Sequence, residues 1–463
     1  MKQILISLLA CLFASFAFGA DNRLFDAVRK ADRDAVRELL RNHADVNASQ
    51  PDGSTPLLLA ADRNDAAIVD LLIKAGAHVN TRNDFGATPL YAACTIGNMS
   101  IIKTLLEAKA DPNAPLVSGE TSLMAAVDKG NLEAVRLLLD HGANVDAQEF
   151  KGGQTALMWA AAGKHNEIVK VLVERGANVR TRSKGDFTAL LFAAQQGDVK
   201  AGRTLIDAGA DVNDSRKKDR VTPLMLAAAG GHTEFAVLLL DRGANPNFVD
   251  DGGRTALHLA ALNEKRVELV KALLSHGANP NSRTTKDSPR NLNAGVSFKG
   301  ATPLFFAASR GNIETVRALV AGGADPFVTT DDKTAPLHVA TWGGNPGNRD
   351  WTEEEKKNLL EVTRFLVDLG ADVNSTGEHQ WTALHGAAYK GVDPVVEFLV
   401  EKGARIDVFD EYGQTPLSIA SAVTTAGLKE YYYQRSQVLR KSTADLLLKL
   451  GARPLDQSGI QTR

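Results

Sequence analysis

Two blocks of apolar residues alternate with polar stretches and return along most of the chain. In the copy that opens with Thr155-Ala156-Leu157, small residues at 160–162 are followed by bulkier apolar residues at 168–173 and then by Gly176. The first block is short and rich in alanine, which suits a helix whose backbone approaches its neighbours closely. The second block places its apolar residues on one helix face. Each copy therefore predicts two short helices.

The Thr-x-Leu opening sets the period of this pattern. Successive openings are 33 or 34 residues apart, except for two separations of 47 residues. A fixed period in this range is the signature of a stacked solenoid. The openings lie at Thr55, Thr88, Thr121, Thr155, Thr188, Thr222, Thr255, Thr302, Thr382 and Thr415, and Ala335 takes the threonine position in one further copy.

A glycine closes the second block of most copies, where a helix C-terminus favours a residue with positive φ. The residues that follow are rich in Asp, Asn and Gly and predict a turn or hairpin. With Thr255-Ala256-Leu257-His258-Leu259-Ala260-Ala261 and Gly277-Ala278-Asn279-Pro280-Asn281, the chain resembles the ankyrin-repeat family. The resemblance implies an all-α ankyrin-repeat solenoid of about twelve helix-turn-helix units with β-hairpin or turn connections.

The first twenty residues predict an export signal. Residues 1–20 combine Lys2, an apolar core and small residues near a cleavage point after Gly19 or Ala20, as in a secretory signal peptide. An uncleaved anchor is one alternative, because the apolar run approaches the length that spans a bilayer. A lipoprotein signal ending at Cys11 is another. With the signal removed, we expect no stable membrane insertion and a periplasmic or secreted location.

The ankyrin-repeat domain is expected over residues 21–453, followed by a tail at 454–463. Residues 22–54 lack the Thr-x-Leu opening and carry extra charge, which predicts an N-terminal cap that meets water. Insertions interrupt the period near 283–299, 343–357 and 421–441.

Two of these insertions predict helices of their own. Thr352 and Glu355 match a capping box, so a longer second helix should begin near Glu353. The last copy has apolar residues at helical spacing, which predict one long closing helix. These residues are Leu428, Tyr432, Leu439, Leu446 and Leu450.

Composition and charge narrow the class of protein. The formal net charge is −2, so no global field favours nucleic acid as a partner. The two cysteines, Cys11 and Cys94, are too few for a disulfide framework. Other copies carry alanine or valine at the position of Cys94, so we interpret it as a buried small apolar residue.

The sequence indicates no catalytic, cofactor or metal site. His258, His338 and His385 occupy the same position of three copies, and repetition at one position indicates packing or hydrogen bonding, since catalysis needs a unique constellation. Zinc-binding, nucleophile-elbow and phosphate-loop motifs are absent from the sequence. We therefore expect a protein that is not an enzyme.

The family resemblance implies that partners bind to hairpin tips and to the exposed side of the first helices. Large side chains in such positions are typical of binding hot spots, and they concentrate near the insertions. The candidate partner-binding residues are Arg310, Trp342, Trp381, Tyr389, Lys390 and Tyr412. The alternative for Phe298 and Trp381 is that they only cover hairpin bases. The tips with Phe85 and Phe150 are given less weight.

The leading functional hypothesis is an exported, non-catalytic protein–protein interaction scaffold, expected to be a monomer. Its partner would bind to the hairpin tips and the concave face of the first helices. An accessory or inhibitor subunit of a secreted or periplasmic enzyme is the alternative. An effector delivered to another cell is a third possibility, which the plain secretory signal disfavours.

Overall fold

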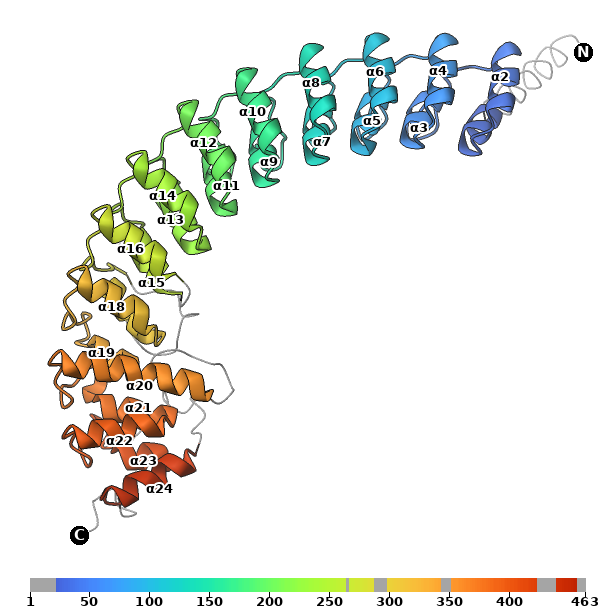
Figure 1. The fold of residues 1–463 in the computed structure, drawn as a ribbon. Coiled ribbons are helices and arrows are strands. Elements are labelled where there is room, and N and C mark those ends of the chain that lie inside the picture. The colour runs from blue at the N-terminus through green and yellow to red at the C-terminus, as the bar shows by residue number, and fades with distance from the viewer. Residues whose placement is uncertain (1–21, 264–265, 287–297, 343–350, 423–438, 456–463) are drawn as a thin grey trace, which may run out of the picture. The chain divides into compact units, whose positions relative to one another are not determined.

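The computed structural model describes residues 22–263, 266–286, 298–342, 351–422 and 439–455. Within these residues the helices form twelve pairs, which confirms the predicted solenoid of helix-turn-helix units. The same residues contain no strand, and the connections are turns with one isolated antiparallel bridge between Gln148 and Thr155. Figure 1 shows the pairs following one another along each half of the chain.

The chain divides into two compact units, Met1–Asp211 and Val212–Arg463. In the first unit a helix at residues 22–29 precedes the second helix of the first pair. The other helices of this unit are α2 (Arg33–Arg41), α3 (Pro56–Asp62), α4 (Ala66–Lys74), α5 (Pro89–Ile96), α6 (Met99–Glu107), α7 (Ser122–Asp128), α8 (Leu132–Asp140), α9 (Ala156–Ala162), α10 (Asn166–Glu174), α11 (Ala189–Gln196) and α12 (Val199–Asp207).

The second unit continues the same alternation of first and second helices, with one added 3₁₀ turn. Its elements are α13 (Pro223–Gly230), α14 (Thr233–Asp241), α15 (Ala256–Ala261), α16 (Val267–Ser275), α17 (Pro303–Ser309), α18 (Ile313–Ala321), α19 (Pro336–Trp342), α20 (Glu353–Asp368), η2 (Glu378–Gln380), α21 (Ala383–Lys390), α22 (Asp393–Glu401), α23 (Pro416–Ala420) and α24 (Lys441–Lys449).

Local chemistry explains where each helix of a pair begins and ends. Thr55 is the N-cap of α3, and its hydroxyl accepts the N–H of Leu58 at 3.2 Å. The following proline suits the first turn, where no intrahelical acceptor exists for an N–H. The second helix α4 buries Ile68, Val69 and Leu72. Just beyond it, Gly76 adopts a φ of 89°, as the sequence predicts for the closing glycine.

Asparagine side chains bridge neighbouring repeats. The Asn47 side chain donates to the carbonyl of Gly76 at 3.2 Å and accepts the N–H of His78 at 2.7 Å. One amide thus satisfies a helix C-terminus and a turn of the next repeat. The same two bonds are made by Asn80, Asn113, Asn213, Asn247, Asn281 and Asn374.

The two helix predictions at the insertions have opposite outcomes. Helix α20 begins at Glu353 with both bonds of the Thr352–Glu355 capping box, as predicted. The single long closing helix is wrong at Leu439 and Arg440, which are not helical. The N–H of Arg440 donates to the carbonyl of Ala420 in α23, so α24 begins only at Lys441. Leu428 and Tyr432 lie outside the described residues, as do residues 1–20, where an export signal is predicted, and most of the tail.

Candidate functional site

Three predicted partner-binding residues meet between α19 and α21. The rings of Trp342 and Trp381 have centroids 5.2 Å apart, and those of Trp381 and Tyr389 are 5.8 Å apart. The two helices approach closely here because α21 carries Gly386, where a Cβ would lie 2.7 Å from the Thr341 hydroxyl. The structure therefore joins these residues into one aromatic cluster.

Trp381 is the buried centre of this cluster, which corrects the prediction that it is exposed. It is 9% exposed and stacks on His385, with centroids 6.1 Å apart. Its indole Nε1–H donates to Asp410 at 2.9 Å. Burial raises the pKa of the Asp410 carboxyl above its usual value, although N–H groups of Gln414, Tyr412 and Trp381 donate to it. Trp381 is thus a packing residue bonded to the next repeat, and its burial favours the alternative that it covers a hairpin base.

The half-buried rim of the cluster carries a cation held by two aromatic rings. The Lys390 ammonium lies 5.6 Å from the centroid of the Trp351 ring and 5.7 Å from that of the Tyr389 ring. Such contacts fix a lysine that would otherwise sample many rotamers. The sequence analysis missed Trp351, because it lies outside the repeated pattern. Its position directly before the Thr352 cap was the available signal.

The other two predicted residues, Tyr412 and Arg310, have different surroundings. Tyr412 stands at the next tip, where its hydroxyl is 3.0 Å from Nδ1 of His379 and the two rings are 5.4 Å apart. His379 also contacts the Glu411 carboxylate and has a φ of 56°. Arg310 is the half-buried C-cap of α17, and no contact within the described residues joins it to the aromatic cluster.

Phe298, the other residue for which packing was the alternative, is buried. It is 7% exposed and stacks on Phe306, with centroids 5.5 Å apart and Phe305 at its edge. This side chain covers the base of the turn before α17. The insertion residues 287–297 that precede it lie outside the described residues.

The most exposed large apolar side chains lie instead at three consecutive tips of the first unit. Phe85 is 70% exposed, Val117 is 68% exposed and Phe150 is 60% exposed. The two phenylalanines are not among the candidate partner-binding residues predicted from the sequence, and neither is Val117. The available signal was an apolar residue in the tip of three successive repeats.

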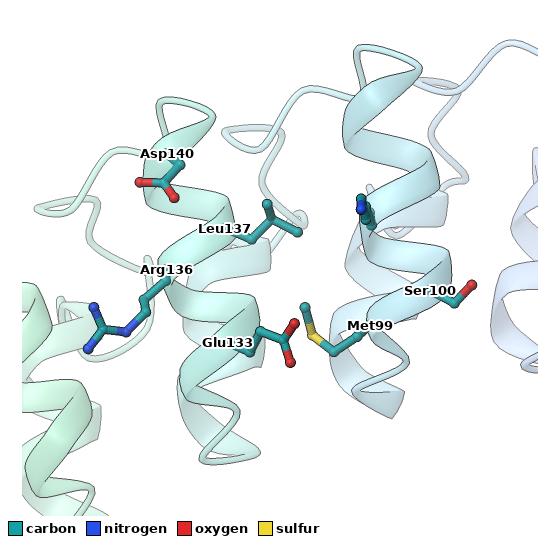
Figure 2. Close-up of a pocket in the computed structure, with 7 residues that line it drawn as sticks. Met99, Ser100, Glu133, Arg136, Leu137 and Asp140 are labelled. Atoms are coloured by element: carbon teal, nitrogen blue, oxygen red, sulfur yellow. The ribbon is translucent and has the colours of Figure 1, made fainter.

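A shallow pocket of about 390 Å³ lies on the second helices of the first unit. Figure 2 shows Met99 of α6 beside Glu133 of α8, with Leu137 between the two helices. Lys103, Arg136 and Asp140 also line it, so charges of both signs surround a small apolar floor. Asp140 is already paired with Arg175, the C-cap of α10, at 2.6 Å.

The repeated histidines make structural hydrogen bonds. Nδ1 of His385 accepts the N–H of Thr382 at 3.1 Å, and Nε2 lies 3.3 Å from the Gln414 carbonyl in the next repeat. His258 makes the corresponding bonds to Thr255 and Ala301. Burial lowers the pKa of both histidines to about 4, so both are neutral at pH 7. The predicted packing and hydrogen-bonding role is confirmed.

Other chemical candidates are equally limited in the described part of the chain. Cys94 is fully buried, as interpreted from the sequence, and burial raises the pKa of its thiol to about 12. No group of three or more His, Cys, Asp and Glu side chains among the described residues is arranged to hold a metal. No helix within the same residues is long and apolar enough to cross a bilayer.

Comparison with known families agrees with this geometry. A model of ankyrin repeats in three copies matches residues 24–116, 110–183, 190–284 and 354–429, and a single ankyrin-repeat model matches 299–331, so the matches cover more than half of the chain. The chain belongs to the ankyrin-repeat family. Ankyrin repeats are in general protein–protein interaction scaffolds, and the family is typically non-catalytic.

Individual ankyrin-repeat proteins resemble only part of the chain. Ankyrin repeat and SOCS box protein 3 of Bos taurus is 32% identical over 138 residues, which cover 29% of this chain and 23% of that protein. A putative E3 ubiquitin-protein ligase, XBAT35 of Arabidopsis thaliana, is 34% identical over 120 residues, which cover 25% of this chain and 23% of that protein. The chain thus spans about a quarter of the length of these relatives.

Among solved structures, the ankyrin repeat domain of Bcl-3 is similar at 30% identity with a TM-score of 0.41, covering 44% of this chain and 93% of that domain.

Proposed function

We propose that the chain is an exported, non-catalytic scaffold whose protein partner docks on the aromatic cluster between α19 and α21. The observation that carries this proposal is the rim formed by Trp351, Tyr389 and Lys390. It combines large amphipathic rings with a fixed charge, which is the composition of binding hot spots.

The buried half of the cluster supports the same proposal. The ring of Trp381 packs against the ring of Tyr389, and its indole N–H donates to Asp410. A partner would therefore meet side chains that have lost most of their rotamer freedom before binding, and the entropy cost of docking falls accordingly. Export rests on residues 1–20 alone, whose apolar core and small-residue cleavage point resemble a secretory signal.

Capture of partners by matched variants tests the proposal. Immobilised Tyr389→Ala/Lys390→Ala should retain roughly tenfold less of the partner than the unaltered protein does, because truncation removes the rim and leaves the buried core intact. Phe327→Ala removes another exposed phenylalanine of the second unit and should retain the partner fully. Mass spectrometry of proteins captured from exported fractions provides the measurement.

The site assignment is wrong if both variants capture the same proteins in the same amounts. Thermal melting must show that both variants remain folded. Trp381→Ala is unsuitable for this purpose, since it removes a buried side chain and would lower stability by itself. A captured enzyme whose rate changes in the complex would favour the accessory-subunit alternative.

A further inference from the structure

Among the described residues of the first unit, the three most exposed large apolar side chains lie in adjacent tips and form one stripe. Phe85, Val117 and Phe150 lie in the tips that precede α5, α7 and α9. Backbone hydrogen bonds join these tips directly: the N–H of Val117 donates to the carbonyl of Phe85 at 2.9 Å, and that of Phe150 to Ser118 at 2.6 Å. Three large apolar groups in adjacent exposed positions are unusual on a protein that remains alone in solution.

The tips hold these side chains in fixed positions. Gly119 has a φ of 87°, and a Cβ there would lie 2.8 Å from the Phe150 ring, so this ring rests directly on the neighbouring tip. Below it, the Glu149 carboxylate accepts the N–H groups of Lys151, Gly152 and Gln154. Such a surface loses little conformational entropy when something binds to it.

Charges at the two ends of the stripe have opposite signs. Asp84 lies next to Phe85, and Lys151 lies next to Phe150. Both side chains are exposed, and neither has an ion-pair partner among the described residues. One repeat further out, Asp52 lies at the acidic end and Lys184 at the basic end. Both outer charges already make hydrogen bonds: Asp52 accepts the N–H of Ser54, and the Lys184 ammonium donates to the carbonyl of Phe150.

We infer that this stripe, Asp84-Phe85-Val117-Phe150-Lys151, is a contact surface between two copies of the chain. A two-fold rotation centred on Val117 places Phe85 against Phe150 of the second copy and Asp84 against its Lys151. The spacings match without adjustment, because the two outer tips each lie one repeat away from the central tip. A surface that carries acid, apolar groups and base in this order is complementary to itself under that rotation.

The dimer is weak and depends on concentration. Three apolar side chains and two symmetric charge pairs form a patch at the low end of specific interfaces. We expect a dissociation constant in the micromolar range, roughly 10–100 µM, and weaker association at high salt because the charge pairs are exposed. A dimer departs from the monomer expected from the sequence. Its surface is distinct from the proposed partner site in the second unit.

Charge reversal tests the symmetry of the contact. Sedimentation velocity of the full chain at low ionic strength should show dimers. The double variant Phe85→Ser/Phe150→Ser should raise the dissociation constant of the dimer at least about tenfold. Asp84→Lys alone sets two lysines against each other, and Lys151→Asp alone sets two aspartates against each other, so each variant should be monomeric. An equimolar mixture of these two variants should recover a heterodimer, since both of its contacts pair a lysine with an aspartate.

The double variant Asp84→Lys/Lys151→Asp should also recover the dimer. Phe327→Ser is the control, because it alters an exposed phenylalanine outside the stripe and should dimerise like the unaltered chain. A chain that is monomeric over the whole micromolar range overturns the inference. So does a dimer that survives the single charge reversals, or two monomeric variants whose mixture remains monomeric.

Discussion

At the scale of single residues, one position of the repeat decides how the fold responds to acid. This position is the third residue of the first helix, and histidine occupies it only in the second unit, at His258, His338 and His385. In each case burial lowers the pKa of the imidazole in the folded protein. The first unit has Leu58, Tyr91, Met124, Met158 and Leu191 at this position.

The second unit should therefore unfold at higher pH than the first unit as acid is added. A histidine of the unfolded chain has a pKa of about 6.5 and binds a proton below that pH, whereas the buried imidazoles of the folded protein stay neutral down to about pH 4. The free energy of unfolding therefore falls between about pH 6.5 and pH 4. For His258 and His385, whose pKa is about 4, the loss is about 3 kcal/mol each. Above pH 6.5 these histidines are neutral in both the folded and the unfolded chain, so they add no pH dependence to the free energy of unfolding.

Hydrogen exchange at a series of pH values measures this difference. Protection should be lost in α15 and α21 at a pH where α3, α5 and α7 are still protected. His385→Leu, which copies Leu191 of the first unit, should flatten the pH dependence even though it removes hydrogen bonds. Equal loss of protection in both units would contradict the role assigned to the histidines.

At the scale of helices and turns, the asparagine bridges couple neighbouring repeats, and two successive bridges in the first unit are incomplete. Asp146 accepts the N–H of Asn178 at 2.9 Å, as the asparagines do. A carboxylate has no hydrogen to donate, so it cannot make the second bond, to Gly176. The following repeat shows the reverse defect: Arg180 donates to Gly209 but has no side-chain acceptor for the next turn.

Asp146→Asn should stabilise the first unit by completing this bridge. The gain should be about 0.5–1 kcal/mol, because one exposed hydrogen bond is added and the existing acceptor is kept. Urea unfolding followed by circular dichroism provides the measurement. Asn113→Asp is the matched control and should lower stability by a similar amount. A stabilising effect from both changes would show that charge, and not the amide donor, is responsible.

The sequence predicts the elements of this fold well because their causes are local. Threonine caps, closing glycines and the Thr352–Glu355 box each depend on residues within one turn of helix, and the structure has them except for the cap bond of Thr188. Burial of Trp381 depends on Asp410 in the following repeat. The start of α24 likewise depends on a bond from Arg440 to Ala420. Periodicity carries no information about such contacts between repeats, so exposure within the candidate site could not be predicted.

At the scale of a whole unit, stability arises from contacts between neighbouring repeats, because no helix pair encloses a core of its own. Leu172 of α10 illustrates this. It is fully buried, and its helix packs against α8 of the preceding repeat as well as α12 of the following one. Each repeat is therefore part of the core of two others.

Leu172→Ala should lower the free energy of unfolding of the first unit by about 2–5 kcal/mol. Because the lost side chain faces the core shared by three repeats, hydrogen exchange should accelerate in α8 and α12 as well as in α10. Lys170→Ala, on the exposed face of α10, is the control and should change neither quantity appreciably. Faster exchange confined to α10 would show that the repeats are less coupled than their packing indicates.

The incomplete bridge at Asp146 also has a mechanical consequence. When an array of repeats is stretched, the asparagine bridges carry part of the load from one repeat to the next, and a bridge with two bonds resists more than a bridge with one. The seam between the repeats of α5/α6 and α7/α8 is held by a complete bridge from Asn113. In the next seam, between the repeats of α7/α8 and α9/α10, the bridge at Asp146 has a single bond. Under tension, we expect the first unit to part at Asp146 or at the next seam, where the bridge of Arg180 is incomplete as well.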